Sequence, residues 1–220
     1  MIDNELLEIF EKEIDELEEN LDLEKENLKE EEEENKQKDN KKENTIKIRE
    51  KVLLHVCCAP CASFCIEQLK KKYDITLFFS NSNIYPKEEY DKRLENAEKI
   101  AGIHKLNLIE DKYDHDSWKE HVKGLEKEPE GRNRCKKCFE FNLIKTAKYA
   151  MQNSFDFFTT TLTISPHKDS QKIFEIAKAL PNFLEIDFKQ DDGFDKSVEL
   201  SKKHNLYRQN YCGCEFSKKE

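Results

Sequence analysis

The chain has 220 residues, of which 39% are charged, and a formal net charge of -9. The first 50 residues hold 20 acidic and 9 basic side chains, which leaves a net charge of about +2 on residues 51–220. A net charge of about +2 is too small to indicate by itself a nucleic-acid-binding domain, which is usually strongly basic. The chain shows no basic leader and no apolar run of about 18 residues, so we expect a cytoplasmic protein without a membrane segment.

The N-terminal segment is dominated by Glu and Lys. Apolar residues recur at helical spacing from Leu6 to Leu28, and this pattern predicts an amphipathic helix. We expect residues 1–48 to form an acidic, partly helical extension, which could join two copies of the chain as a dimer. Residues 49–220 are expected to form a cysteine-rich α/β catalytic domain.

The texture of the sequence changes after this extension. The short continuous apolar run from Val52 to Val56 is typical of a strand buried on both faces. Similar runs predict strands at 75–79, 106–109, 155–162 and 183–188, and helices are predicted between and after them at 63–72, 87–101, 139–152, 169–180 and 194–204. This alternation predicts a mostly parallel, Rossmann-like (HUP-like) sheet with helices on both faces and a site beyond the carboxyl ends of the strands.

The first cysteine group follows the first predicted strand directly. It consists of Cys57, Cys58 and Cys61, and Pro60 suits the entry to a helix. Cys61 should therefore lie near a helix N-terminus, where the helix dipole favours a thiolate. Cys65 follows on the same helix face and is expected to be a small buried side chain.

Two further cysteine pairs stand later in the chain. Cys135 and Cys138 are flanked by cations and are expected just before a helix starting near Phe139. Cys212 and Cys214 lie near the C-terminus, where Gly213 lets the backbone turn tightly enough for both sulfurs to face one ligand.

Eight cysteines in a reducing cytosol indicate metal ligands or redox catalysts rather than disulfides. If the three groups meet, neighbouring thiolates about 4 Å apart repel by about 4 kcal/mol at an effective dielectric near 20. A zinc ion and a cubane iron-sulfur cluster each take about four cysteines, so the surplus indicates a cluster with a second metal or a redox-active thiol pair. Two alternatives remain: a structural zinc held by the two later pairs, and a thioredoxin-like pair of Cys58 and Cys61.

Several sequence blocks resemble the family of QueH-type epoxyqueuosine reductases. The first is Leu54-His55-Val56-Cys57-Cys58-Ala59-Pro60-Cys61, and the likeness covers about residues 51–217. The others are Asn83-Ile84-Tyr85-Pro86 with Glu89, Tyr90 and Arg93; Arg134-Cys135 with Cys138; Thr159-Thr160-Thr161-Leu162; Ser165-Pro166-His167; Asp187-Phe188; and Leu206-Tyr207-Arg208-Gln209-Asn210-Tyr211-Cys212-Gly213-Cys214. Ser82 departs from the pattern by replacing a proline of the second block.

The resemblance implies that the epoxide of epoxyqueuosine in tRNA is reduced to the cyclopentene of queuosine, with two electrons and two protons consumed and water released. It also implies a 4Fe-4S cluster with a second iron, or zinc in its place, and an external electron donor of the ferredoxin or flavodoxin type.

We expect the cluster ligands to be drawn from all three cysteine groups, one of Cys57 or Cys58 with members of the two later pairs. The remaining thiols, including Cys61, would serve the second metal. The expected catalytic residues are Cys61, Asp187 and Tyr207. Substrate-binding residues are expected among Asn83, Tyr85, Glu89, Tyr90, Arg93, Ser165, His167, Arg208 and Gln209. His55, within a strand, is expected to be a hydrogen-bonded core residue.

Two other functions fit parts of the sequence. A tRNA-thiolation-type enzyme with an iron-sulfur cluster would share the sheet, but its expected Ser-Gly-Gly loop is replaced by Cys57-Cys58-Ala59-Pro60. A zinc-stabilised tRNA-binding module would account for four sulfurs and would be colourless.

Overall fold

The structure is a computed structural model that describes residues 49–217. Both the predicted acidic helix and the dimer expected through it lie outside the described residues. Within residues 49–217, no helix combines the length and the apolar composition needed to cross a lipid bilayer.

Four parallel strands form the sheet: β1 (Lys51–His55), β2 (Asp74–Phe79), β3 (Asn107–Glu110) and β4 (Phe157–Thr160). Their order is β3-β2-β1-β4, so β1 lies inside the sheet between β2 and β4. Val52, Leu53 and Leu54 of this strand are 0% exposed, as a strand covered on both faces requires. The predicted parallel α/β sheet is confirmed.

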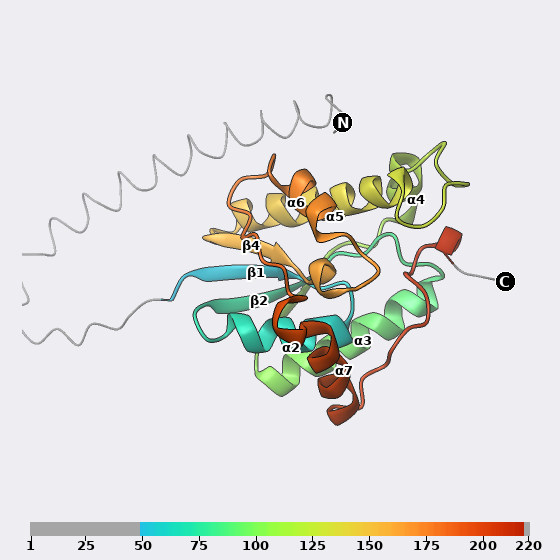
Figure 1. The fold of residues 1–220 in the computed structure, drawn as a ribbon. Coiled ribbons are helices and arrows are strands. Elements are labelled where there is room, and N and C mark those ends of the chain that lie inside the picture. Colours follow the sequence, from blue (N-terminus) through green and yellow to red (C-terminus); the bar gives the residue numbers. More distant parts are fainter. Residues whose placement is uncertain (1–48, 218–220) are drawn as a thin grey trace, which may run out of the picture. The chain divides into compact units, whose positions relative to one another are not determined.

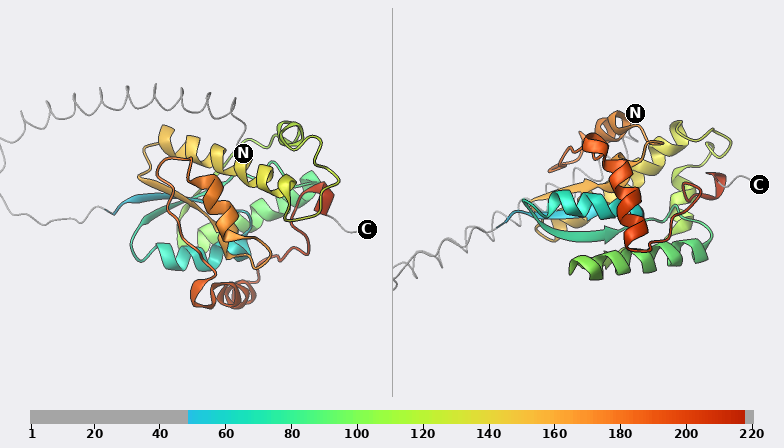
Figure 2. Two further views of the ribbon diagram at one scale, coloured as in Figure 1. Left: turned by 45° about the horizontal axis from the view of Figure 1, so that its top comes forward. Right: turned by 60° about the horizontal axis from the view of Figure 1, so that its bottom comes forward.

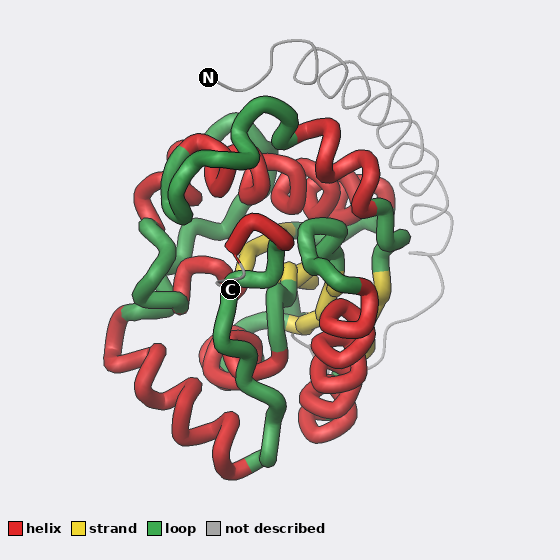
Figure 3. Tube along the Cα trace, turned by 90° about the vertical axis from the view of Figure 1, so that its right-hand side faces the viewer, coloured by secondary structure: helices red, strands yellow, loops and turns green. Residues whose placement is uncertain are grey.

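Helices cover both faces of this sheet (Figures 1 and 2). One face carries α2 (Ala59–Leu69), α3 (Lys87–His104) and α7 (Gly193–Lys203), and the other carries α5 (Asn133–Gln152) and α6 (Ser170–Ala177). The short helix α4 (His115–His121) packs beside α5. The strands all point the same way, so their carboxyl ends form one edge, which Figure 3 shows end-on, surrounded by loops.

The strand predicted at 183–188 is wrong. Only a single bridge joins Phe183 to Phe158 of β4, after which the chain leaves the sheet. Two backbone hydrogen bonds form this bridge, from the Phe158 amide to the Asn182 carbonyl at 3.1 Å and from the Leu184 amide to the Phe158 carbonyl at 2.8 Å. Beyond them the contacts come from threonine hydroxyls: Oγ1 of Thr159 donates to the carbonyl of Leu184 at 2.9 Å, and Oγ1 of Thr163 donates to that of Ile186 at 2.9 Å. β4 ends at Thr160, because residues 161–164 turn into a 3₁₀ helix. The segment 183–188 therefore has no longer strand beside it with which to pair.

Two helix predictions also need correction. The helix expected from Phe139 begins at Asn133, so Cys135 and Cys138 lie on its first two turns rather than before it. Helix α4 was not predicted, because seven residues are too few to show a periodic pattern. It forms around Trp118, which is fully buried, and Asp114 caps it by accepting a hydrogen bond from the Ser117 amide at 3.0 Å.

His55 ties three strand ends together at the carboxyl edge. Its Nδ1 lies 2.8 Å from Oγ1 of Thr160, and its Nε2 lies 3.1 Å from the carbonyl of Ser80. Burial lowers the pKa of His55 to about 4, so the ring is neutral, with Nε2 donating to the carbonyl and Nδ1 accepting from the hydroxyl. The predicted core role of His55 is confirmed.

Replacing His55 with alanine is expected to lower the free energy of unfolding by about 3 kcal/mol, because it opens a cavity and leaves two buried polar groups unpaired. The matched control is His104→Ala at the partly exposed end of α3, with an expected loss below about 1 kcal/mol. Urea unfolding of both variants measures the difference, and equal losses would contradict the role given to His55.

Candidate metal centre at the carboxyl edge

Cys57, Cys58 and Cys61, here called the strand-end triad, lie where β1 runs into α2. Cys58 is the N-cap of α2, and Pro60 stands in its first turn as the sequence predicts. The Sγ atoms of the triad all lie within 4.8 Å of one another, with Cys57 and Cys58 3.9 Å apart. Thr161 anchors Cys57, since its Oγ1 accepts from the Cys57 amide at 3.1 Å and lies 3.3 Å from Sγ.

The thiols of the triad cannot all ionise independently. Hydrogen bonding between them raises the pKa of Cys57 and Cys61 and lowers the pKa of Cys58 well below its usual value. These opposite directions favour a thiolate on Cys58 that accepts hydrogen bonds from the other two thiols, and a bound cation would release the remaining protons. A tetrahedral ion with metal-sulfur bonds of about 2.3 Å places its sulfur ligands about 3.8 Å apart, so the triad fits a single metal ion after a small contraction.

Cys135, Cys138, Cys212 and Cys214, here called the quartet, form the second sulfur group. Burial raises the pKa of Cys138, and the charges of Cys212 and Cys214 raise it further. Burial likewise raises the pKa of Cys135 and Cys212, and among the other thiols Cys214 has the largest effect on each. The charge of Cys214 therefore raises the pKa of each of the other three thiols, although the four cysteines come from α5 and from the C-terminal segment.

Gly213 allows the C-terminal segment to reach this position. Its φ of +133° is a conformation that other residues rarely adopt. A Cβ atom there would lie only 3.0 Å from Nη1 of Arg93. The tight turn expected at Gly213 is therefore present, and it serves a close approach of backbone to guanidinium.

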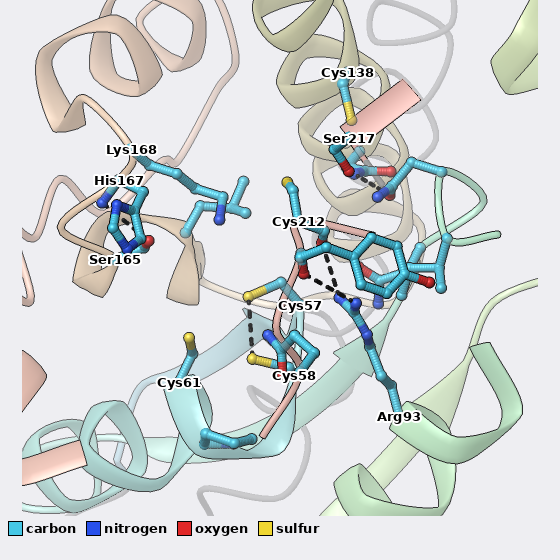
Figure 4. A pocket seen from close by; sticks show the side chains of 18 of the residues that line it. Cys57, Cys58, Cys61, Arg93, Cys138, Ser165, His167, Lys168, Cys212 and Ser217 are labelled. Atoms are coloured by element: carbon cyan, nitrogen blue, oxygen red, sulfur yellow. Dashed lines mark hydrogen bonds between the residues drawn. The ribbon is translucent and has the colours of Figure 1, made fainter. Parts of the chain in front are cut away.

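The strand-end triad and two members of the quartet, Cys138 and Cys212, line one cavity of about 840 Å³, a size suited to small-molecule ligands. Figure 4 shows the triad at one side and Cys138 and Cys212 at another. A smaller adjacent cavity of about 120 Å³ is lined by Cys135 and Cys212, while Cys214 is buried. Cys65 is 0% exposed in the core, as expected. The three cysteine groups that the sequence separates therefore meet at one edge of the sheet.

Arg93 borders the cavity, but it is buried and engaged within the protein. Its Nε donates to Oε1 of Glu89 at 2.7 Å. Its Nη1 donates to the carbonyl of Cys212 at 2.9 Å, and its Nη2 donates to that of Tyr211 at 3.3 Å. Arg93 is among the residues expected to bind substrate, and here it holds the segment that carries two quartet cysteines.

The structure brings five of the other expected substrate-binding residues to the cavity: Asn83, Ser165, His167, Arg208 and Gln209. Asn83 accepts a hydrogen bond from Nδ2 of Asn142 at 3.0 Å. Oε1 of Gln209 and Oδ1 of Asn142 are buried acceptors without a hydrogen-bond partner in the described part of the chain. Both residues line the cavity.

Five other expected site residues do not border the cavity, and most have partners elsewhere. Tyr85 is exposed and stacks on His115. Glu89 binds Arg93 and accepts a hydrogen bond from the hydroxyl of Tyr207 at 3.0 Å. Tyr90 is buried with its hydroxyl on Glu110, and Asp187 accepts hydrogen bonds from Ser170 and the Lys189 amide.

Lys168 and Asn142 also line this cavity, and the sequence did not predict them as site residues. Lys168 directly follows the Ser165-Pro166-His167 block, and that position was the only signal for it. One lysine among 38 basic residues carries no signal of its own.

The described geometry can be compared with known proteins. Residues 52–220 match the family model described as epoxyqueuosine reductase QueH. The protein of that name from Streptococcus pyogenes serotype M1 is 39% identical over 183 residues, which cover 78% of this chain and 72% of the relative. The one from Thermotoga maritima is 37% identical over 174 residues, which cover 76% of this chain and 89% of the relative.

Among solved structures, the U34-tRNA thiolase NcsA from Methanococcus maripaludis with its 4Fe-4S cluster is similar at a TM-score of 0.39 and 11% identity. The match covers 74% of this chain and 69% of the thiolase.

Proposed function

Because the chain belongs to the QueH family of epoxyqueuosine reductases, we propose that it reduces the epoxide of epoxyqueuosine in tRNA to the alkene of queuosine. The observation that carries this proposal is one cavity, large enough for a modified nucleoside, that the strand-end triad lines together with Cys138 and Cys212. Loss of the epoxide oxygen as water consumes two electrons and two protons. A one-electron donor protein of the ferredoxin or flavodoxin type would have to act twice.

The grouping of the sulfurs favours a particular division of the metals. We propose that the quartet holds a 4Fe-4S cluster, because four neighbouring cysteines match the usual ligand number. The compact strand-end triad would hold a second iron and leave one position open. This division differs from the expectation from the sequence, in which all three cysteine groups supply cluster ligands. When bound, the cluster would supply single electrons and the second iron would supply Lewis acidity.

Residues of this chain would position the base and the metal ligands. Asn83, Asn142 and Gln209 offer amide groups to the edge of a guanine-like base, and two of these amides have unpaired buried oxygens. Thr161 orients the Cys57 sulfur, and Arg93 fixes the backbone at Cys212. Arg208 is exposed at the cavity and suits an RNA phosphate.

A turnover assay tests this proposal directly. Anaerobically reconstituted protein, given a chemical one-electron reductant and tRNA carrying epoxyqueuosine, should form queuosine in multiple turnovers and absorb at about 400 nm. A colourless protein that holds zinc and binds this tRNA without converting it would instead indicate the zinc-stabilised binding module.

A further inference from the structure

Lys168 lies in the loop that joins β4 and its 3₁₀ turn to α6. The loop is held on both sides of this residue: the Lys168 amide donates to the carbonyl of Ser165 at 3.2 Å, and the Lys168 carbonyl accepts from Nζ of Lys189 at 2.7 Å. The side chain points from this loop toward Cys57 and Cys212 (Figure 4). The backbone of Lys168 is therefore held in place.

The ammonium group faces both sulfur groups. Lys168 lines the large cavity and the small one beside it. Burial opposes its charge, but Cys212, Cys57, Cys61 and Cys58 outweigh burial and raise the pKa of Lys168. An ordinary lysine has a pKa of about 10.4, so this side chain carries a positive charge at neutral pH.

The other cations at the cavity are differently placed. The Arg93 guanidinium is occupied by Glu89 and two carbonyls, and Nη1 of Arg208 donates to Oγ of Ser201 at 3.1 Å. For Lys168, no carboxylate lies within ion-pair distance of the ammonium among residues 49–217. Its donors are thus available to an acceptor on a ligand.

We propose that Lys168 is a catalytic residue whose ammonium donates a hydrogen bond to the epoxide oxygen of the substrate, between the strand-end triad and the quartet. This inference rests on the proposed function and deepens it. As the carbon-oxygen bonds break, negative charge grows on that oxygen, and a fixed cation stabilises it. Lys168 keeps its proton: the two electrons come from the one-electron donor protein and the two protons of the departing water from solvent.

The test compares Lys168→Met and Lys168→Arg with the control Lys178→Met, which removes an exposed charge at the end of α6. Each anaerobically reconstituted variant is analysed for iron and sulfide, for its dissociation constants with tRNA carrying epoxyqueuosine or queuosine, and for its single-turnover rate.

For Lys168→Met we expect unchanged iron and sulfide and a single-turnover rate reduced by about 100-fold to 1000-fold. The preference for epoxyqueuosine tRNA over queuosine tRNA should fall by about tenfold, because only the former offers the oxygen acceptor. Lys168→Arg should recover part of both losses, and Lys178→Met should resemble the wild type.

Three results would overturn the proposal. A Lys168→Met rate within threefold of the wild type would exclude the role, and so would a loss of iron proportional to the loss of rate. Equal weakening for both tRNAs with an unchanged rate would indicate a phosphate contact instead. If the wild-type protein itself fails to convert the tRNA, the proposed function fails, whereas a failure confined to Lys168 leaves it standing.

Discussion

Replacing Cys138 with alanine is expected to remove the 4Fe-4S cluster and with it at least about 99% of the reductase activity. Burial raises the pKa of Cys138, and the charges of Cys212, Cys214 and Cys135 raise it further. With only three sulfurs left, the cluster would keep one iron without a cysteine ligand in a cavity that a solvent molecule can enter. Absorbance at about 400 nm and sulfide content after anaerobic reconstitution measure the loss.

The chain supplies its own control for this variant. Cys65 is a buried cysteine of the hydrophobic core and borders neither of the two cavities. Cys65→Ala should keep iron, sulfide and activity, while losing about 1 kcal/mol of stability from the smaller side chain. A Cys138→Ala protein with full cluster content would remove Cys138 from the ligand set and contradict the quartet.

Replacing Cys58 with serine is expected to produce a different defect: activity falls at least about 100-fold while the cluster remains. Cys58 carries the most stabilised thiolate of the strand-end triad, so its loss should release the second metal. Serine is a favoured N-cap, so helix α2 should begin as it does in the parent protein.

Iron analysis of the Cys58→Ser variant should show about one iron fewer per chain, with sulfide unchanged. Thr163→Ser, a buried change without a sulfur in the 3₁₀ turn that follows β4, is the matched control and should keep all metals. If Cys58→Ser loses sulfide and colour instead, the triad contributes a ligand to the cluster. That result would support the alternative in which all three cysteine groups supply cluster ligands.

The sequence predicted the parts of the fold that depend on strong local patterns. β1 is a continuous apolar run, and the carboxyl end of a buried parallel strand is where sites gather, so Cys57 and Cys58 could be placed correctly. Pro60 marked the start of α2 for a local reason as well. The prediction of a strand at 183–188 was wrong because an apolar run does not reveal whether a neighbouring strand has a free edge with which it can pair.

The site was harder to predict because its residues depend on contacts between distant segments. The sequence placed Arg93 among the substrate-binding residues, but its hydrogen-bond partners Tyr211 and Cys212 stand more than a hundred residues away. Tyr207 pairs with Glu89 across a similar separation. Lys168 is a candidate only because the fold brings cysteine sulfurs near it, and these sulfurs raise its pKa. The residues next to Lys168 in the sequence do not predict this environment.

Anomalous diffraction from anaerobic crystals, measured above and below the iron absorption edge, would locate the metals most directly. We predict a four-iron density enclosed by Cys135, Cys138, Cys212 and Cys214, and a separate single iron at Cys57, Cys58 and Cys61. A lone zinc ion at the quartet, with no iron at either sulfur group, would contradict the account.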